Sequence, residues 1–322
     1  MKFGILAPGN IARSMAKAVS EIEGMECYAV ASRDYGRAEN FAKQWGFAKA
    51  YGSYQELAED PQVELIYVAS PHSHHYEHTK LCLLHGKHVL VEKAFTVNAA
   101  QAEELIRLSE EKGLLLAEAI WTRYMPSRKM IDDILASGVL GKVTSLTANL
   151  GYILPHVERM QNPELAGGAL LDLGVYPINF ALMAFQGEVE KIDATAIMSP
   201  RGVDWMNSIT LSFADGKMAV LHSDMLAQTD RQGVISGDQG YLEVQNINNC
   251  EEIRVFDLNR KMTACYQVPE QINGYEYEVL SCKKAIEEGK CECPEMPHSE
   301  TLRVMRILDR IRRQWGMVFP CE

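Results

Sequence analysis

The sequence predicts an α/β protein in which a doubly wound parallel sheet is followed by an α+β domain with an open, mostly antiparallel sheet. Three observations lead to this fold class. The first 120 residues alternate short apolar runs with helical patterns, as parallel strands joined by crossover helices do. From residue 142 onward, runs with a period of two predominate instead. Finally, 322 residues are more than one hydrophobic core usually supports.

We place the domain boundary near residue 120, which gives one domain at 1–120 and another at 121–322. The composition, 47% hydrophobic and 23% charged, is typical of a soluble globular protein. No apolar run approaches the length of a membrane span. The chain begins with a strand pattern rather than a signal peptide, so we expect a cytoplasmic protein.

Charge and cysteine content narrow the range of partners. A formal net charge of -11 argues against nucleic acid or an anionic membrane as the main partner. The eight cysteines form no zinc-like C-x-x-C pairs, so we expect free thiols in a reducing compartment. His74 and His78 are four residues apart, but no motif such as H-E-x-x-H accompanies them, and we predict no metal site.

The first predicted strand runs into the segment APGNIA at residues 7–12, which a helical pattern follows. This order is typical of a variant of the dinucleotide-binding fingerprint G-x-G-x-x-G/A, in which Ala7 replaces the first glycine. Gly9 lets the backbone approach a pyrophosphate, and Ala12 allows close packing of the helix on the strand. We therefore predict a Rossmann domain whose cofactor site includes Ala7, Gly9, Asn10 and Ile11.

The second predicted strand ends at Ser32 and Arg33, where such domains place the residue that reads the ribose. NAD-specific sites have a carboxylate there. A hydroxyl and a guanidinium suit a 2′-phosphate better, and Arg37 offers a second charge one turn later. We therefore expect NADP, with NAD possible because Asp34 is adjacent.

Two further predicted strands end in polar residues at the same edge of the sheet. A buried strand at 63–69 is followed by a histidine-rich run that begins at Pro71, and its position favours the cofactor crevice. We assign Pro71 and His75 from this run to the cofactor site. A short apolar strand at 88–91 leads into Glu92 and Lys93, which we also assign to the cofactor site.

Residues 167–181, GGALLDLGVYPINFA, predict a buried helix with one polar stripe. Asp172 and Tyr176 are four residues apart and therefore share a helix face, and Asn179 follows on that face one turn later. Two interpretations remain open: these groups bond to neighbouring backbone, or they carry chemistry. Pro177 has no N–H to donate within the helix, so we expect a bend just after Tyr176.

The sequence resembles the Gfo/Idh/MocA oxidoreductase family in the order and spacing of four segments. These are the fingerprint, ASR at 31–33, GKHVLVEK at 86–93 and the 167–180 segment. The resemblance covers nearly the whole chain. EAIWTRYMP at 118–126, Tyr176 and the ending GMVFP are most similar to its dihydrodiol dehydrogenase and NADP-dependent xylose dehydrogenase branch. It implies that Lys93 is the lysine of the family's E-K-P motif, and that Asp172 and Tyr176 are the helix pair of the active site. Ala94 departs from the pattern by replacing the proline.

The predicted mechanism uses Lys93, Asp172 and Tyr176 as catalytic residues. Tyr176 is the acid/base candidate, and because a free phenol titrates near ~10 it needs a neighbouring cation, which Lys93 supplies. Asp172 orients the substrate hydroxyl or Lys93. The expected substrate is a sugar, polyol or trans-dihydrodiol that exchanges a hydride with NADP(H). The alternative is a non-catalytic NADP-binding sensor or regulatory protein, which Ala94 favours.

The second half supplies the expected substrate contacts and a dimer surface. Trp121 and Arg123 either line a substrate cleft or pack the domain interface, and Asn179 stands where many family members have an aspartate. Several predicted antiparallel strands form a sheet with the 167–181 helix on one face, so a second subunit is expected to cover the other, and the resemblance implies the same homodimer. Closing helices are expected at 275–288 and 300–315. We interpret the arginines of the last helix as a solvated face.

Overall fold

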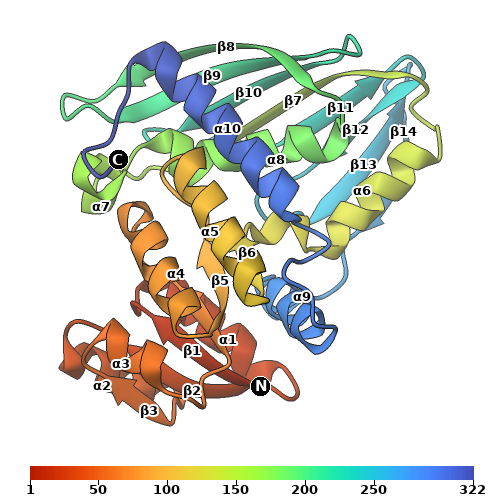
Figure 1. Ribbon diagram of the computed structural model, residues 1–322. Helices are drawn as coiled ribbons and strands as arrows, with labels where there is room; N and C mark the ends of the chain where they lie inside the picture. The colour runs from red at the N-terminus through yellow and green to blue at the C-terminus, as the bar shows by residue number, and fades with distance from the viewer. The chain divides into compact units, whose positions relative to one another are not determined.

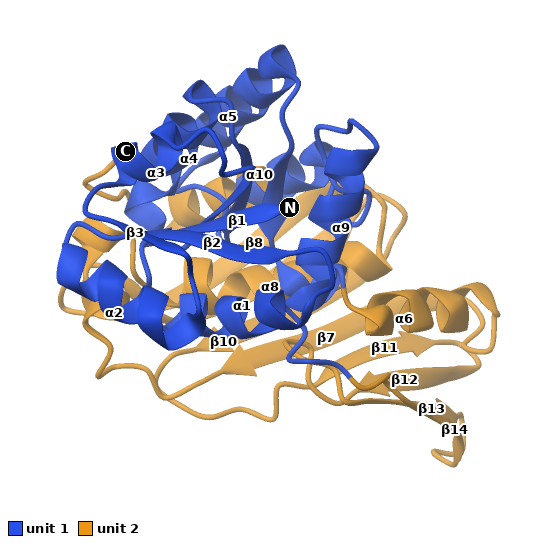
Figure 2. Cartoon of the chain, turned by 90° about the horizontal axis from the view of Figure 1, so that it is seen from below, with its two compact units in different colours: residues 1–124, 271–305 blue, residues 125–270, 306–322 orange.

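The computed structural model describes residues 1–322 and divides the chain into two compact units (Figure 2). The first unit comprises residues 1–124 and 271–305, and the second comprises residues 125–270 and 306–322. The predicted division differs in one respect, because it assigned everything after residue 120 to one domain. The segment 271–305 returns to the first unit, where helix α9 (Glu276–Glu287) packs on α1 (Asn10–Glu21).

The first unit is built on a six-stranded parallel sheet with the order β3-β2-β1-β4-β5-β6 (Figure 1). Its strands are β1 (Lys2–Leu6), β2 (Glu26–Ala31), β3 (Lys49–Tyr51), β4 (Leu65–Val68), β5 (His88–Glu92) and β6 (Leu116–Ala119). The order runs outward from β1 in both directions, which confirms the predicted doubly wound sheet and puts its switch point between β1 and β4.

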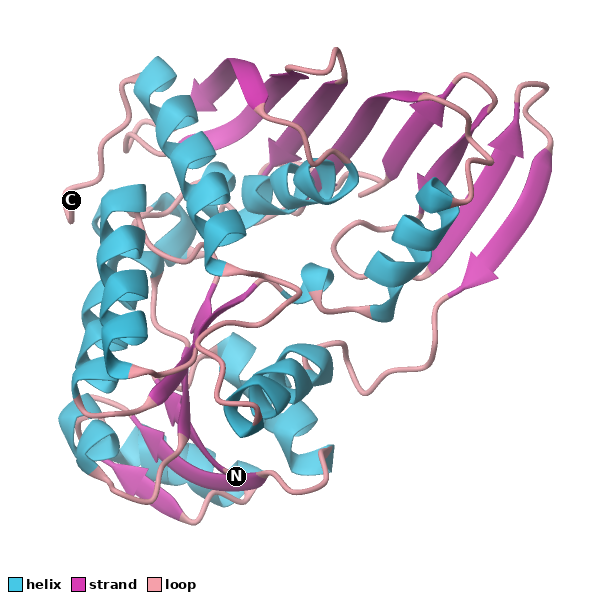
Figure 3. Cartoon of the chain, turned by 45° about the vertical axis from the view of Figure 1, so that its right-hand side comes forward, coloured by secondary structure: helices cyan, strands magenta, loops and turns pink.

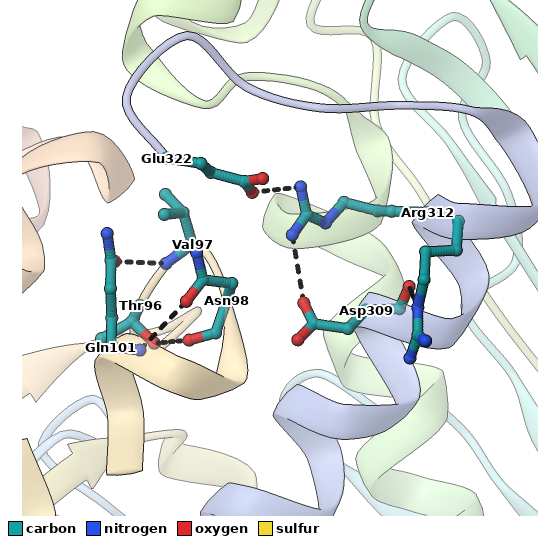
Figure 4. Close-up of polar contacts among 8 residues, drawn as sticks. Thr96, Val97, Asn98, Gln101, Asp309, Arg312 and Glu322 are labelled. Atoms are coloured by element: carbon teal, nitrogen blue, oxygen red, sulfur yellow. Dashed lines mark hydrogen bonds and ion pairs between the residues drawn. The ribbon is translucent and has the colours of Figure 1, made fainter. Parts of the chain in front are cut away.

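Helices cover both faces of this sheet, with α1 and α2 on one side and α3, α4 and α5 on the other in Figure 2. The remaining helices of the unit are α2 (Tyr35–Trp45), α3 (Tyr54–Glu59), α4 (His75–Leu84), α5 (Ala99–Lys112) and the 3-10 turns η1 (His72–His74) and η2 (Trp121–Arg123). A capping box opens α3, since Ser53 and Glu56 each accept the other's backbone N–H. Asn98 caps α5 by accepting from the backbone N–H of Gln101 at 3.0 Å (Figure 4).

The second unit is built on an eight-stranded, mostly antiparallel sheet with the order β14-β13-β12-β11-β7-β10-β9-β8 (Figure 3). Its strands are β7 (Val143–Gly151), β8 (Val189–Met198), β9 (Asp204–Phe213), β10 (Met218–Asp224), β11 (Gly233–Gly237), β12 (Gly240–Val244), β13 (Glu252–Asp257) and β14 (Met262–Gln267). Only β7 and β10 pair in parallel. The predicted sheet is confirmed, and β14 is its edge strand, of which no residue is buried.

One face of this sheet is covered by α8 (Val175–Ala184), which contacts β7, β10 and β11. This unit also contains α6 (Pro126–Ala136), α7 (Glu158–Gln161) and the 3-10 turn η3 (Pro163–Leu165). Helix α10 (His298–Trp315) begins in the first unit and ends in the second. The strand register places one row of side chains on the opposite face, where Met218 and Val220 are 45% and 42% exposed. Tyr241 and Phe256 stack on the same face with ring centroids 4.8 Å apart.

The arginines of α10 do not form a uniformly solvated face, contrary to the expectation from the sequence. Arg312 is buried and pairs with Asp309 at 3.0 Å and with the carboxylate of Glu322 (Figure 4). Arg310 donates to the backbone oxygens of Val189 and Glu190. The helical period alone could not reveal these contacts, because most of their partners lie in β8 and in the last residues of the chain.

The segment that carries Asp172 and Tyr176 is a π-helical turn, η4 (Leu170–Gly174), continued by α8. The predicted distortion therefore lies before Tyr176 rather than after it. Pro177 leaves the carbonyl of Leu173 without its usual helical donor, and a local π-turn is one way in which a helix accommodates such a gap. Contrary to the expectation from the sequence, the stretch 163–184 is long and apolar enough to span a membrane by composition alone, but 94% of its most apolar window is buried inside the protein, as in a core helix.

Asp204 holds the start of this segment. Its Oδ2 atom accepts hydrogen bonds from the backbone N–H of Leu170 at 2.8 Å and from the side chain of Asn207 at 2.9 Å. Gly168 has a φ of +110°, and a Cβ there would lie 2.4 Å from Oδ1 of Asp204. A glycine is therefore required for the carboxylate to reach the helix N-terminus.

We predict that Asp204 contributes more to the free energy of unfolding in mild acid than at neutral pH. Burial raises its pKa from 3.8 to about 6, so the folded protein binds this proton more tightly than the unfolded chain does. The contribution is complete below the unfolded pKa and is lost as the pH rises through about 6. Relative to Asp204→Asn, the wild type should gain on the order of 2–3 kcal/mol in the free energy of unfolding between pH 7 and pH ~4.

Urea unfolding of both proteins across this pH range tests the prediction, since the difference cancels other titrating groups. Asp215→Asn is the matched control, because Lys217 lowers the pKa of that exposed carboxyl. Asp215→Asn should show no such gain in acid. A wild-type minus Asp204→Asn difference that does not change with pH would rule out the proposed titration.

Candidate active site

The turn between β1 and α1 has the backbone that the fingerprint predicted. Ala7 adopts a φ of +68°, the left-handed conformation usually taken by the glycine it replaces. Its N–H donates to the carbonyl of Ala31, and the N–H of Gly9 donates to the carbonyl of Ala7. A Cβ on Gly9 would meet no atom within 4 Å, and no side chain caps α1. Open space in front of an uncapped helix N-terminus fits the pyrophosphate of a dinucleotide.

Side chains after β2 surround the same turn. Arg37 donates from Nη2 to the carbonyl of Pro8 at 3.0 Å, which fixes its guanidinium beside the fingerprint. Asp34, the residue that NAD would need, caps α2 by accepting the backbone N–H of Arg37 at 3.3 Å. Ser32 is buried and accepts the backbone N–H of Asp34. Arg33, between these two residues, is exposed.

The histidine-rich run lies at the carboxyl end of β4. Pro71 begins the 3-10 turn η1, and His74 and His78 stack with ring centroids 5.5 Å apart. Burial lowers the pKa of both histidines, and the charge of Arg33 lowers it further. The three side chains therefore lie close together. No group of three or more histidine, cysteine or acidic side chains is arranged to hold a metal ion.

His75 was predicted to contact the cofactor, but it is buried with both ring nitrogens engaged by backbone. Nδ1 lies 2.8 Å from the carbonyl oxygen of Ala94, and Nε2 lies 2.8 Å from that of Ser70. Burial is the main cause that lowers the pKa of His75 to about 4. The ring therefore ties the loop after β4 to the loop after β5, and its role at this edge is to organise the two loops.

Lys93 follows directly on β5, at the edge of the sheet where the sequence placed it. The preceding Glu92 is buried, and its carboxylate accepts the hydroxyl of Tyr67 and the backbone N–H of Lys93. Glu92 was predicted to bind the cofactor, whereas these contacts make it a local anchor for the residue after it. The peptide bond from Lys93 to the buried Ala94 is cis.

Two further buried acids lie in this unit. Glu278 of α9 is fully buried, and burial together with the charge of Glu92 raises its pKa well above the usual value. Burial raises the pKa of Glu118 to about 7, although Thr301 donates a hydrogen bond to its carboxylate. Both environments favour the neutral acid, so the interior of this unit carries less negative charge than its composition suggests.

The residues predicted to line a substrate cleft after β6 are packed within the first unit. Trp121 is largely buried and stacks on Tyr275, with ring centroids 4.4 Å apart and planes inclined by 13°. Arg123 is buried and pairs with Glu300 at 3.0 Å. Both contacts lie within the first unit, and the stacked pair of Trp121 and Tyr275 is one that the sequence pattern did not reveal.

In the second unit, Asp172 and Tyr176 are both about nine-tenths buried on the segment formed by η4 and α8. Arg159 of α7 donates two hydrogen bonds to the carboxylate of Asp172, from Nη1 to Oδ1 at 3.0 Å and from Nη2 to Oδ2 at 3.2 Å. Asn179 was predicted to contact substrate, but it is fully buried and donates to the carbonyl of Val175 in its own helix. This contact is of the kind expected from one of the two interpretations of the sequence, in which the polar groups of this helix bond to neighbouring backbone.

Two models of protein families match the sequence. An oxidoreductase family with an NAD-binding Rossmann fold matches residues 1–119, and the GFO/IDH/MocA C-terminal domain matches residues 129–243. Among curated proteins, the trans-1,2-dihydrobenzene-1,2-diol dehydrogenases of Macaca fuscata fuscata and Homo sapiens are 35% and 34% identical to this chain. Each alignment covers 99% of this chain and 98% of the relative.

Solved structures agree with the family match. The 3-ketoreductase KijD10 from Actinomadura kijaniata, solved in complex with NADP and TDP-benzene, has a TM-score of 0.89 at 26% identity and covers 97% of both chains. The aldose-aldose oxidoreductase from Caulobacter crescentus has a TM-score of 0.88 over 99% of both chains, and at 22% identity this match shows the shared fold alone.

These matches extend through both units and join a dinucleotide-binding domain to the family's own C-terminal domain. The relatives at this level of identity are dehydrogenases, which favours an enzyme over the non-catalytic sensor. The chain is an NAD(P)-dependent dehydrogenase and belongs to the Gfo/Idh/MocA oxidoreductase family.

Proposed function

We propose that this dehydrogenase transfers a hydride between NADP(H) and a carbinol of a sugar, polyol or trans-dihydrodiol. The observation that carries the proposal is the placement of Asp172 and Tyr176 on one helical segment, with Asp172 held by an arginine. A carboxylate and a phenol on one face can orient a hydroxyl and exchange its proton. The names of the relatives, which are dihydrodiol dehydrogenases, support the same substrate class.

Tyr176 is the proposed acid/base residue. It accepts the hydroxyl proton as the carbonyl forms and returns it in the reverse direction, while the nicotinamide supplies the hydride chemistry. A phenol needs a nearby positive charge to act as a base near neutrality, because its ordinary pKa is about 10. We assign that charge to Lys93, at the carboxyl end of β5. Asp172 orients the substrate hydroxyl.

The local contacts of the first unit support NADP rather than NAD. Asp34 caps α2 by accepting the backbone N–H of Arg37, so one of its carboxylate oxygens is already engaged. Arg33 and Arg37 are both exposed near the fingerprint turn, and Arg37 is anchored on Pro8. A guanidinium recognises a phosphate through charge-assisted hydrogen bonds. KijD10 was also crystallised with NADP.

We further propose a homodimer in which a second copy covers the open face of the eight-stranded sheet. Apolar side chains on that face include Met218, Val220 and the stacked Tyr241 and Phe256. Exposed apolar side chains that gather on one face are typical of protein interfaces. The same face carries hydroxyl-bearing residues of β7 and β9, which suit a mixed polar and apolar contact.

The activity is tested by incubating the protein with NADP and a panel of aldoses, polyols and trans-1,2-dihydrobenzene-1,2-diol, and following NADPH absorbance. We expect turnover with at least one hydroxyl compound of the panel. Tight NADP binding without turnover in either direction would count against the proposed function.

Tyr176→Phe is expected to lower kcat by about 10²- to 10⁴-fold, the usual contribution of a general acid/base. The affinity for NADP should be nearly unchanged, because the change removes only the phenolic hydroxyl. NADPH formation and NADP titration on the same preparations provide the measurement. Tyr241→Phe on the sheet is the matched control. Activity of Tyr176→Phe within a few-fold of wild type would exclude the phenol from proton transfer.

Arg33→Ala is expected to weaken NADP binding by roughly ten- to a hundred-fold and to leave NAD binding nearly unchanged, since only NADP carries the 2′-phosphate. The preference for NADP should also fade as salt rises, because the guanidinium is exposed. Calorimetric titration of both cofactors makes the measurement. Arg107→Ala, in the exposed pair with Glu111, is the control. Equal losses for both cofactors would mean that Arg33 does not recognise the 2′-phosphate.

Val220→Glu is expected to weaken the proposed dimer by at least about a hundred-fold, because it places a charge in a contact that excludes water. Sedimentation velocity over a range of concentrations measures the change. Leu84→Glu, an exposed position on α4 in the other unit, should leave association unchanged. A wild-type protein that is monomeric at all concentrations would contradict the proposal.

A further inference from the structure

The contact between Arg159 and Asp172 is the most specific polar interaction in the segment of the second unit that carries the proposed chemistry. Two hydrogen bonds, of 3.0 and 3.2 Å, join two guanidinium nitrogens to the two carboxylate oxygens. The side chain of Asp172 is 8% exposed, whereas that of Arg159 is 44% exposed. The guanidinium therefore reaches inward from a more open position to a carboxylate that is mostly buried.

Helix α7 delivers Arg159 to this position through contacts on either side of it. Glu158 pairs with Arg201 at 2.9 Å, and Gln161 accepts the indole N–H of Trp205 at 3.0 Å. Met160 is fully buried. A helix of 4 residues is not stable by itself, and the buried Met160 and the bond from Trp205 hold α7 in place, whereas the Glu158–Arg201 pair is exposed and adds little.

The backbone after α7 fixes the distance to Asp172. The N–H of Gly168 donates to the carbonyl of Met160 at 2.9 Å, so the chain folds back on α7 just before η4 begins. A Cβ on Gly167 would lie 2.4 Å from the carbonyl oxygen of Arg159. The glycine pair at the start of the predicted helix therefore also allows α7 to approach Asp172 closely.

A bidentate arginine has two effects on a carboxylate. It fixes the plane of the carboxylate, whose terminal torsion otherwise has a broad energy well. It also supplies the opposite charge that a buried carboxylate requires. The carboxylate is therefore presented in one defined plane, which is what alignment with a substrate hydroxyl requires.

We propose that Arg159 is a positioning residue for the reaction, which holds Asp172 in the orientation that receives the substrate hydroxyl. The proposal rests on the proposed function of Asp172 and adds a residue outside the Lys93, Asp172 and Tyr176 set. Arg159 acts through Asp172 and is not itself a proton donor or acceptor in the reaction, because a guanidinium stays protonated throughout the usual pH range. Its removal should therefore affect turnover through the alignment of the substrate hydroxyl.

The test compares Arg159→Gln, Arg159→Lys, Asp172→Asn and the double variant Arg159→Gln/Asp172→Asn. With NADP and the hydroxyl compound of the panel that wild type oxidises best, Arg159→Gln should lower kcat by about 10²-fold, the effect of a small misalignment at the reacting centre. KM and NADP affinity should change by no more than a few-fold. Arg159→Lys should lose less activity than Arg159→Gln, because lysine keeps the positive charge but lacks the paired N–H donors of the guanidinium.

The double variant decides whether Arg159 acts through Asp172. If it does, Arg159→Gln/Asp172→Asn should be no slower than Asp172→Asn alone, since the Asp172→Asn change already leaves the arginine no carboxylate to hold. The same cycle in urea unfolding, without cofactor, should show that the two substitutions shift the midpoint non-additively. Losses of kcat that simply multiply would overturn the proposal, even if each single variant is impaired.

Arg201→Gln is the matched control for the folding of α7. It breaks the pair with Glu158 and leaves both side chains of the Arg159–Asp172 contact intact. We expect near-wild-type kcat from this variant. A loss equal to that of Arg159→Gln would show that the effect is one of helix docking and would overturn the positioning role.

Failure of this proposal is distinguishable from failure of the proposed function. If Asp172→Asn retains full activity, the role of Asp172 itself is wrong. If Asp172→Asn is strongly impaired while Arg159→Gln is not, the proposed function stands and only the role of Arg159 is excluded.

Discussion

The carboxylate of Asp204 is the constraint on which the placement of the Asp172 and Tyr176 segment depends. It receives the first helical N–H groups of the segment that contains Asp172 and Tyr176, and it does so from the start of β9. A buried carboxylate at a helix N-terminus is stabilised by the helix dipole and by the N–H groups it accepts. Because Asp204 links β9 to η4, the sheet, and not helix propensity, sets the position of the segment that carries Asp172 and Tyr176, the side chains proposed to react.

Much of the fold follows from local sequence patterns because its elements are individually strong. The buried strand expected at residues 63–69 is β4, and the closing helix expected at 275–288 is α9. The return of 271–305 to the first unit could not be predicted in this way. That return depends on packing between α9 and α1, which lie far apart in the sequence and share no periodic signal.

The candidate site was predictable to the extent that its residues have fixed spacing or stand at strand ends. Lys93 follows β5, and Asp172 and Tyr176 share one segment, as the sequence indicated. Arg159 was missed because a helix of 4 residues has no recognisable period. The spacing that placed Asn179 on the same face and left two interpretations open for Arg123 could not show their partners, which are a backbone carbonyl and the carboxylate of Glu300.

The local charges and dipoles at the cofactor site favour an anion, although the protein as a whole is negatively charged. A net charge of -11 repels an anionic dinucleotide at long range, but this repulsion is screened beyond roughly 8–10 Å at physiological salt. Within that distance the N-terminus of α1 has no acidic residue in its first turn and no capping side chain. Arg37 is fixed on the adjoining turn, and the carboxylate of Asp34 is directed to the N-terminus of α2 by its capping contact. Binding of the phosphates is therefore decided by a few oriented donors, while the overall acidity limits the attraction of other anions to the remaining surface.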